Sequence, residues 1–336
     1  MIFSICAIVL LLSWCLTGLL RRYALARSLL DIPNARSSHA IPTPRGGGIA
    51  IVTCFLLAAP VLVLVGASSV DAMIGYIGGG ALVALIGFAD DHGHIPARWR
   101  LIGHFLAAGW ILPWLGGLAP LMLPFGQINL GGAGIALVLI YLVWMLNLYN
   151  FMDGIDALAS AEAICVCGGA CVVYKLTGYG QLVGYPLVLC AAVAGFLIWN
   201  FPPAKIFMGD AGSGFLGLII GALALQGAWE YGPFLCTWLI LLGVFVVDAT
   251  WTLLHRLARR EKVYQAHRSH AYQFAARNYA SHQVVTSSVV AINVCWLLPI
   301  ATWVAFVPKF GVYGLVLAYS PLCYLAYRLR AGSASD

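Results

Sequence analysis

Long apolar runs alternate with short polar connections along the whole chain. The runs last about 16 to 22 residues, close to the length at which an α-helix crosses the hydrocarbon core of a bilayer. The pattern predicts an all-α polytopic membrane protein, with residues 1–330 as one integral-membrane domain and 331–336 as a short disordered tail. Eleven transmembrane helices are expected, at about 1–20, 47–66, 72–89, 101–118, 132–149, 160–175, 183–200, 212–227, 233–254, 284–307 and 311–328.

Composition agrees with the hydropathy pattern. Hydrophobic residues make up 62% of the chain and charged residues only 9%, against roughly 25% charged residues in a typical soluble domain. The net charge of +6 does not indicate nucleic-acid binding, because the basic residues gather in a few loops beside apolar segments. The expected surrounding is a lipid bilayer.

The basic residues also predict an orientation. Sixteen of the eighteen Lys and Arg residues fall on one side of the alternating path, and Lys175 and Lys309 fall on the other. The positive-inside rule then places the N-terminus in the periplasm and the C-terminus in the cytoplasm of a bacterial inner membrane. All eight histidines and most acidic residues lie in or beside the same loops, so chemistry is expected at the cytoplasmic face. These loops are 21–46, 90–100, 150–160, 200–211 and 255–283.

Two of these loops carry charged groups with more than one interpretation. In "NARSSHAIPTPRGGG", Arg36, His39 and Arg45 are candidates for holding phosphate, although arginines there also satisfy topology. In "FADDHGHIPARWR", Asp90 and Asp91 are adjacent carboxylates at a predicted helix end. Such a pair repels itself, which raises one pKa or demands a cation. Metal binding, phosphate activation and proton abstraction all stay open.

The segment "NFMDGIDALA" places Asn150, Asp153 and Asp156 directly after an apolar run. A spacing of three puts the three side chains on one face if the segment is helical. Their oxygens would suit Mg²⁺ or the polar edge of a base or sugar. Capping of the next helix by Asp156 is the structural alternative.

The segment "NFPPAKIFMGDAGSG" begins at Asn200 and places Asp210 before four small residues at the start of a predicted helix. Small residues let backbone N–H groups approach an anion at a helix N-terminus. A carboxylate beside such an anion implies a bridging cation, most simply Mg²⁺ on a pyrophosphate. Phe207 could stack on a base or anchor the loop. In "HRSHAYQF", which is expected to be helical, His267, Arg268 and His270 could grip a diphosphate or belong to a surface helix.

These motifs, in this order, resemble the polyprenyl-phosphate N-acetylhexosamine-1-phosphate transferase family, glycosyltransferase family 4. The family includes the phospho-MurNAc-pentapeptide translocase and the GlcNAc-1-phosphate transferases that initiate O-antigen synthesis. "HRSHAYQ" is closer to the O-antigen-initiating branch than to the triple-histidine pattern of the translocase. The resemblance implies transfer of an N-acetylhexosamine 1-phosphate from a UDP-sugar to undecaprenyl phosphate, with release of UMP.

The resemblance also implies roles for the candidate residues. Asn150 and Asp210 would hold Mg²⁺, with Mn²⁺ as an alternative ion, and Asp210 would count among the catalytic residues with Asp90 and Asp91, which handle the lipid phosphate. The other residues would bind substrate: Arg36, His39, Arg45, Asp153, Asp156, Asn200, Phe207, His267, Arg268 and His270.

Several alternatives stay open at this level. A secondary transporter for an anionic solute, or a structural membrane protein, would share the composition and the number of spans. The residues fit both direct displacement by the lipid phosphate and a route through an aspartyl intermediate. The sugar (GlcNAc, GalNAc, FucNAc or QuiNAc) and the oligomeric state, with a homodimer as one arrangement, are not indicated.

Overall fold

The computed structural model describes residues 1–33, 41–93, 95–261 and 267–333, and nearly all of its regular structure is helical. In the described residues the helices are α1 (Ile2–Ala26), α2 (Gly48–Leu64), α3 (Val70–Gly93), α4 (Ala97–Leu115), α5 (Gly131–Phe151), α6 (Leu158–Leu176), η1 (Gly180–Val183), α7 (Gly184–Asn200), α8 (Asp210–Glu230), α9 (Phe234–Leu241), α10 (Gly243–Ala258), α11 (Ala271–Tyr279), α12 (His282–Ile292), η2 (Asn293–Leu297), α13 (Leu298–Phe306), η3 (Pro308–Phe310) and α14 (Gly311–Arg328). The strands are β1 (Leu30–Asp31), β2 (Thr43–Pro44), β3 (Leu121–Leu123) and β4 (Gly126–Ile128).

The all-α prediction is confirmed, but eleven membrane spans are not. Each predicted apolar run falls on a helix or on consecutive helices, yet by length and composition only eight of the described helices qualify as spans. A ninth is gained if α9 and α10, which meet at a bend of 73°, count as one span. Two runs fall short for physical reasons. Helix α2 has only 17 residues, and α4 carries Arg98, Arg100 and His104.

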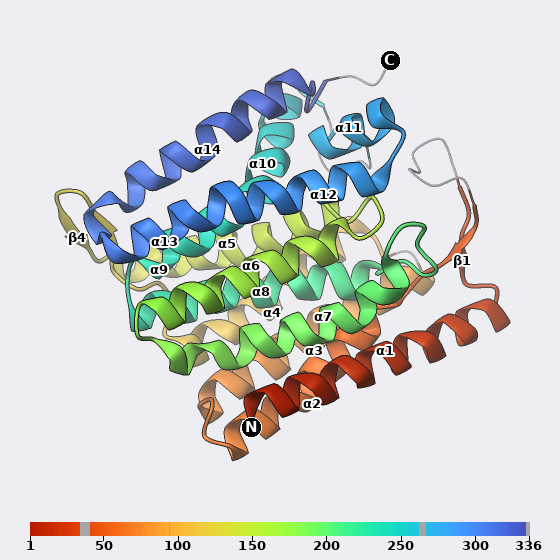
Figure 1. The fold of residues 1–336 in the computed structure, drawn as a ribbon, viewed down its shortest axis with the longest axis horizontal. Helices are drawn as coiled ribbons and strands as arrows, with labels where there is room; N and C mark the ends of the chain where they lie inside the picture. The colour runs from red at the N-terminus through yellow and green to blue at the C-terminus, as the bar shows by residue number, and fades with distance from the viewer. Residues whose placement is uncertain (34–40, 94, 262–266, 334–336) are drawn as a thin grey trace.

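The long helices lie side by side in a bundle, with α8 at its centre (Figure 1). In α8, 94% of the most apolar window is buried inside the protein, against 17% in the peripheral α1. Glycine permits this close packing at the start of α8. A Cβ on Gly212 would come within 2.6 Å of the Cα of Gly48 in α2, and a Cβ on Gly87 of α3 within 2.5 Å of the nitrogen of Ala211. Small residues at such crossings let helices approach within backbone contact in a membrane.

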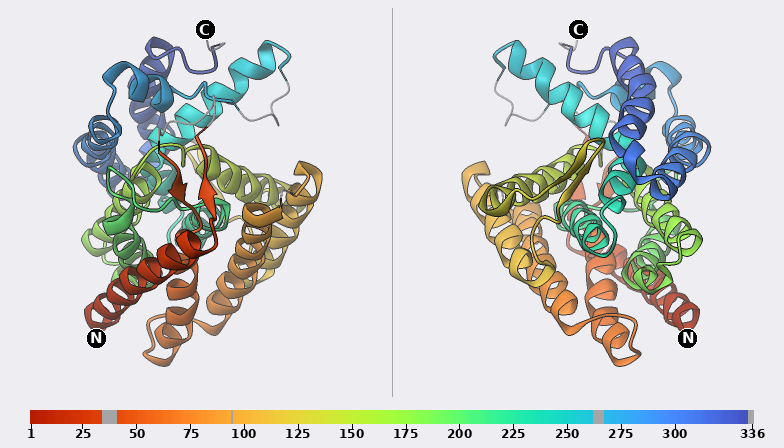
Figure 2. Two further views of the ribbon diagram at one scale, coloured as in Figure 1. Left: turned by 90° about the vertical axis from the view of Figure 1, so that its right-hand side faces the viewer. Right: turned by 90° about the vertical axis from the view of Figure 1, so that its left-hand side faces the viewer.

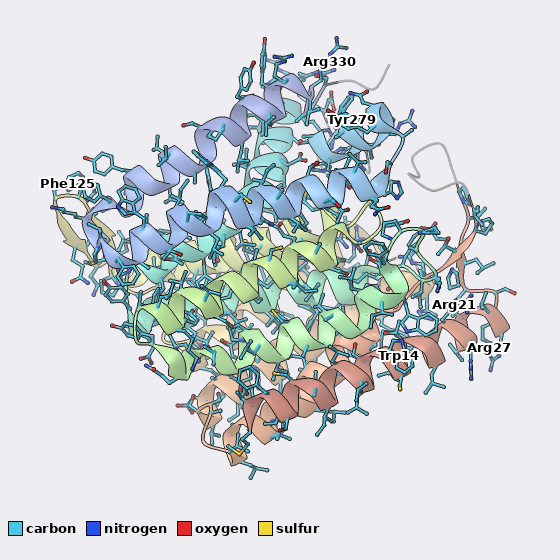
Figure 3. The ribbon with its side chains drawn as sticks, in the orientation of Figure 1. Trp14, Arg21, Arg27, Phe125, Tyr279 and Arg330 are labelled. Atoms are coloured by element: carbon cyan, nitrogen blue, oxygen red, sulfur yellow. The ribbon has the colours of Figure 1, made fainter. Side chains whose placement is uncertain are left out.

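The two ends of the bundle carry different strands and different side chains. Strands β1 and β2 pair antiparallel at one end, where α1 also ends, and the β3–β4 hairpin lies at the opposite end (Figure 1). Figure 3 places Arg21, Arg27, Tyr279 and Arg330 at the first end and Phe125 at the second. The chain begins at the end away from β1, and α14 runs toward the β1 end. The termini thus lie toward opposite ends of the bundle, and the side of the membrane that each faces stays a prediction.

Helix α10 departs from the bundle. After the 73° bend it leans away from its neighbours, which the two views of Figure 2 show clearly. Helix α11 then packs back across α10 and α12, at the same end of the molecule as β1 (Figure 1). This arrangement brings the segment 267–270 beside the loop that follows α5.

Candidate active site

Polar ends of α3, α4, α5 and α8 meet at the β1 end of the bundle and enclose a small cavity of about 50 Å³. Its polar lining includes Asp90, Arg100, Asn150 and Asp210, and we call this cluster the acidic pocket. The four residues come from four helices, of which α3 and α4 are consecutive while α5 and α8 are distant from them in sequence. The close packing of α8 against its neighbours therefore determines their geometry.

Asp210 and Asn150, the two predicted metal ligands, are in direct contact. The Asn150 Nδ2 group donates hydrogen bonds to Asp210 Oδ1 at 3.0 Å and to Ser213 Oγ at 2.9 Å. Both donors of the amide point into α8, and no described residue donates a hydrogen bond to the Asn150 Oδ1 atom. The Asp210 side chain is 30% exposed, which leaves its carboxylate accessible from the pocket.

Arg100 joins the two predicted catalytic carboxylates. Its guanidinium forms an ion pair with Asp90 and lies 3.5 Å from the Oδ2 atom of Asp210. Asp90 also accepts a hydrogen bond from the backbone N–H of Ile95 at 2.6 Å. A single positive charge thus holds together two carboxylates that would otherwise repel each other.

Asp91 lies in a different environment from Asp90. It is 2% exposed, it forms an ion pair with Arg45, and it accepts hydrogen bonds from the backbone N–H groups of Asp210 (3.1 Å) and Ala211 (3.4 Å). Asp91 therefore acts as the N-cap of α8 from a neighbouring helix. The next two N–H groups of α8 both bond to the carbonyl of Gly209. The prediction that this helix terminus offers free N–H groups to a phosphate is thus wrong, because Asp91 already provides the anion.

Asp153 differs from all the carboxylates above, because no side-chain hydrogen bond to it is present among the described residues. It lies in the turn after α5 and is partly exposed. Burial raises the pKa of its carboxyl well above the usual range, and the nearby carboxylates of Asp210 and Asp91 raise it further. A carboxylate in this position favours a cation nearby.

Asp156, Asn200 and Phe207 are tied into the scaffold around the pocket. Helix α5 ends at Phe151, so Asn150, Asp153 and Asp156 do not share one helical face. Asp156 accepts a hydrogen bond from the N–H of Ala204 at 3.0 Å and lies 3.4 Å from His282, and it does not cap α6.

Asn200 and Phe207 stabilise the backbone of the loops next to the pocket. Asn200 is 5% exposed; its Oδ1 accepts from the N–H of Ala157, and its Nδ2 donates to the carbonyl of Ile206. Phe207 pairs through its backbone with Pro44 and Gly47, which fastens the loop before α8 to the segment that carries Arg45. Neither Asp156 nor these two residues are among those that line the acidic pocket.

The segment 267–270 precedes α11 and is not helical, contrary to the prediction. The reason is a carboxylate from α10: Asp248 accepts hydrogen bonds from the N–H groups of Ala271 and Tyr272, both at 3.0 Å, and so caps α11. His270 is 3% exposed, lies 3.1 Å from Asp248, and stacks on Phe151 at the edge of the acidic pocket. His267 stacks on His270 at 4.9 Å. The two histidines thus reach the pocket only through Phe151.

The remaining predicted residues lie elsewhere. Arg268 lines a separate cavity with Arg277 and Arg328, and the structure does not bring it to the acidic pocket. Arg36 and His39 lie outside the described residues.

Sequence reasoning missed three residues that the structure places at or beside the site: Arg100, Asp248 and His282. Arg100 was counted only toward topology, although it stands ten positions after Asp90 in a turn-rich segment. Asp248 and His282 act on loops distant in sequence, and only their charge inside or beside apolar runs could have signalled a partner.

The donor set suits a divalent cation that also binds a phosphate. Among the described residues, no three His, Cys, Asp or Glu side chains are grouped as a closed metal site. Mg²⁺ commonly binds through one or two protein oxygens and completes its coordination with water and substrate phosphate. The Asp210 carboxylate and the Asn150 amide oxygen fit this open arrangement, and Asp153 supplies a further carboxylate close by.

Comparison with known proteins finds a family match in the part of the chain that holds the acidic pocket. Residues 73–228, which include Asp90, Asn150 and Asp210, match the model of glycosyl transferase family 4. This segment belongs to that family. It spans α3 to α8 without the first three residues of α3 and the last two of α8, and therefore contributes every residue that we have named in the acidic pocket.

Three curated relatives are similar to longer parts of the chain. The chain is 27% identical over 273 residues to the probable undecaprenyl-phosphate N-acetylglucosaminyl 1-phosphate transferase of Bacillus subtilis, covering 80% of this chain and 75% of the relative. It is 31% identical over 265 residues to the decaprenyl-phosphate N-acetylglucosaminephosphotransferase of Mycolicibacterium smegmatis (71% and 65%). It is 32% identical over 191 residues to the phospho-N-acetylmuramoyl-pentapeptide-transferase of Moorella thermoacetica (53% and 58%).

Proposed function

We propose that this protein transfers an N-acetylhexosamine 1-phosphate from a UDP-sugar to undecaprenyl phosphate, yielding undecaprenyl-diphosphate-sugar and UMP. The observation that carries the proposal is the contact between Asn150 and Asp210 beside the Asp90–Arg100 pair, inside the segment that matches the family. The names of the relatives support a polyprenyl-phosphate acceptor and an N-acetylated sugar phosphate. We place the reaction at the cytoplasmic face of a bacterial inner membrane, at the start of O-antigen or a related cell-surface glycan.

The chemistry is a phosphoryl transfer. An oxygen of the lipid phosphate attacks the phosphorus that carries the sugar; the bond from that phosphorus to the bridging oxygen breaks, and UMP leaves with the electron pair. Such a reaction depends mainly on positioning and charge neutralisation. Mg²⁺, or Mn²⁺ in its place, would be held by Asp210 and Asn150 and would neutralise charge on the donor diphosphate.

The side chains divide this work. Arg100, held by Asp90, presents a positive charge at the pocket where an incoming phosphate needs one. Asp90 orients the acceptor phosphate through that arginine, while Asp91 and Arg45 fix the start of α8 and hence the position of Asp210. Asp153, with no side-chain partner among the described residues, is available to the sugar nucleotide.

A panel assay tests the proposal. Purified protein is incubated with Mg²⁺, undecaprenyl phosphate and UDP-GlcNAc, UDP-GalNAc or UDP-linked 6-deoxy N-acetylated sugars, and UMP is measured. We expect UMP from at least one donor only when the lipid is present. Absence of UMP with every donor, together with solute uptake into liposomes, would favour a transporter instead. We further propose direct displacement, and labelled sugar phosphate trapped on the protein with UDP-sugar alone would contradict it.

A further inference from the structure

Two cavities adjoin at the corner formed by α10, α11, α12 and α14, on the far side of α11 from the acidic pocket. Each has a volume of about 510 Å³, and the two share Arg328 and Leu329 in their walls. The first is mainly apolar and the second is basic. We call them the apolar slot and the arginine cavity.

The apolar slot lies between α12 and α14, with α10 as its floor and α11 at one end. Its wall is mostly aliphatic, with Val285 and Val289 from α12 facing Leu322 and Leu325 from α14. Leu325 is 41% exposed, so apolar surface continues from the slot to the outside of the bundle. Helix α12, which η2 and α13 continue, belongs to one candidate span, and α14 belongs to another. The outer surface beside the slot therefore faces lipid. A slot of this kind suits a hydrocarbon chain.

The arginine cavity is lined by Arg268, Arg277, Arg328 and Arg330. In the described part of the chain, none of the four guanidinium groups forms an ion pair with a carboxylate. Their contacts are instead neutral: Arg277 donates to the carbonyl of Arg268 at 3.3 Å, and Arg328 donates to the Tyr324 hydroxyl at 2.8 Å. Desolvation and the neighbouring Arg268 lower the pKa of Arg277, as expected for gathered positive charge.

We propose that this corner binds an anionic phospholipid of the bilayer, with its phosphate in the arginine cavity and an acyl chain in the apolar slot. Three observations support this occupant. The charge is complementary to a phosphate, because guanidinium groups bind phosphate with matching geometry. The arginine cavity is continuous with a slot that opens to lipid. Arg328 is also the last residue of a candidate span, the depth at which basic residues meet lipid headgroups.

The bound lipid would also brace α11, which is linked to the catalytic loops. The Tyr272 hydroxyl donates to the carbonyl of Phe151 at 3.0 Å, and the N–H of Gly332 donates to the carbonyl of Ser269 at 2.7 Å. Tyr272 is part of the slot wall, and Ser269 stands between Arg268 and His270. Anionic lipid should therefore raise the thermal stability of this part of the fold.

The test uses the full-length protein in neutral detergent and measures binding of phosphatidylglycerol and of phosphatidylcholine with identical acyl chains. We expect the wild type to bind phosphatidylglycerol at least about tenfold more tightly. The double variant R277Q/R328Q should lose about 25-fold in affinity, since each arginine near an anionic headgroup contributes about fivefold. The matched control is R22Q/R27Q, which removes the same charge from the exposed end of α1 and should change the affinity less than about twofold.

Two further experiments, a slot-filling variant and a lipid competition, test the apolar slot and the identity of the bound lipid. Ser288→Trp fills the apolar slot and should weaken lipid binding while leaving weak binding of inorganic phosphate unchanged. Equal binding of the two lipids, or equal losses in R277Q/R328Q and R22Q/R27Q, would overturn the proposal. So would displacement of phosphatidylglycerol by stoichiometric undecaprenyl phosphate, since the corner would then belong to the acceptor. UMP release by the wild type in the panel assay is independent of all these outcomes.

Discussion

The acidic pocket and the arginine cavity lie at the same end of the bundle but are built in opposite ways. In the acidic pocket every arginine has a carboxylate partner, and the groups converge on the start of α8, the most buried helix of the bundle. In the arginine cavity the described guanidinium groups bond only to neutral oxygens, at the edge of the molecule. The difference indicates that the pocket is preorganised by its own ion pairs, whereas the cavity is left to be neutralised by a ligand.

Two carboxylates at the start of α8, Asp91 and Asp210, make different contacts. The buried carboxylate of Asp91 contacts Arg45 and the start of α8, while Asp210 retains an accessible carboxylate on the first residue of the same helix. One carboxylate thus holds the helix in place, and the other is presented by it. Changes at these two positions should affect different measurements.

Asp210→Asn should give the largest effect on turnover. The amide keeps the shape of the side chain but removes the charge that faces the donor diphosphate and its cation. We expect kcat to fall by at least about 10³-fold, at the upper end of losses for a single electrostatic group. The rate of UMP release at saturating substrates measures this fall in kcat. The control is Glu230→Gln, an exposed carboxylate at the other end of α8, which should keep near wild-type activity.

Arg100→Gln should come next. The change leaves the Asp90 and Asp210 carboxylates without the cation between them, and the acceptor phosphate without its positive partner. A decrease in kcat/KM of about 10²-fold is expected, mainly through KM for undecaprenyl phosphate. Arg98→Gln, two positions away and exposed, is the control and should stay within about twofold. Equal losses in both variants would show that only the total charge of α4 matters.

Asp91→Asn should affect stability more than chemistry. It removes the charged partner of Arg45 and weakens the cap on α8, which should lower the free energy of unfolding by about 2 kcal/mol. Thermal unfolding in detergent measures the change, and folded protein should keep most of its affinity for the sugar nucleotide. Asp71→Asn, exposed at the other end of α3, should shift stability by less than about 0.5 kcal/mol. A fully stable but inactive Asp91→Asn protein would instead place Asp91 in contact with substrate.

The sequence predicted well what depends on local pattern. Apolar periods of membrane length located the helices, and the polar segments beside them contain Asn150, Asp210 and Asp90, which the fold brings together. The sequence predicted poorly what depends on long-range contacts. The role of Asp91 follows from α3 packing against α8 at Gly87, and no spacing in the chain reveals that contact.

The same limit explains the other differences. Helix α11 begins at Ala271 because Asp248, more than twenty positions earlier, accepts its first N–H groups. The bend between α9 and α10 divides one apolar run that hydropathy alone treats as continuous. Arg100 was missed because an arginine near a membrane surface already has an explanation in topology.

His267→Gln should give the smallest effect, visible only as a change in pH dependence. Burial, with the nearby positive groups of His270 and Arg256, lowers the pKa of His267 to about 3 from its ordinary 6.5. The unfolded chain therefore binds a proton that the folded protein does not, and stability falls as the pH falls from 6.5 toward 3. The melting temperature of the wild type should decrease more between pH 7 and pH 4.5 than that of the variant. His92→Gln, an exposed histidine on α3, should keep the wild-type slope. Identical slopes in all three proteins would mean that His267 is as open to solvent as His92. The stacking of His267 on His270 would then not exclude water from the His267 ring.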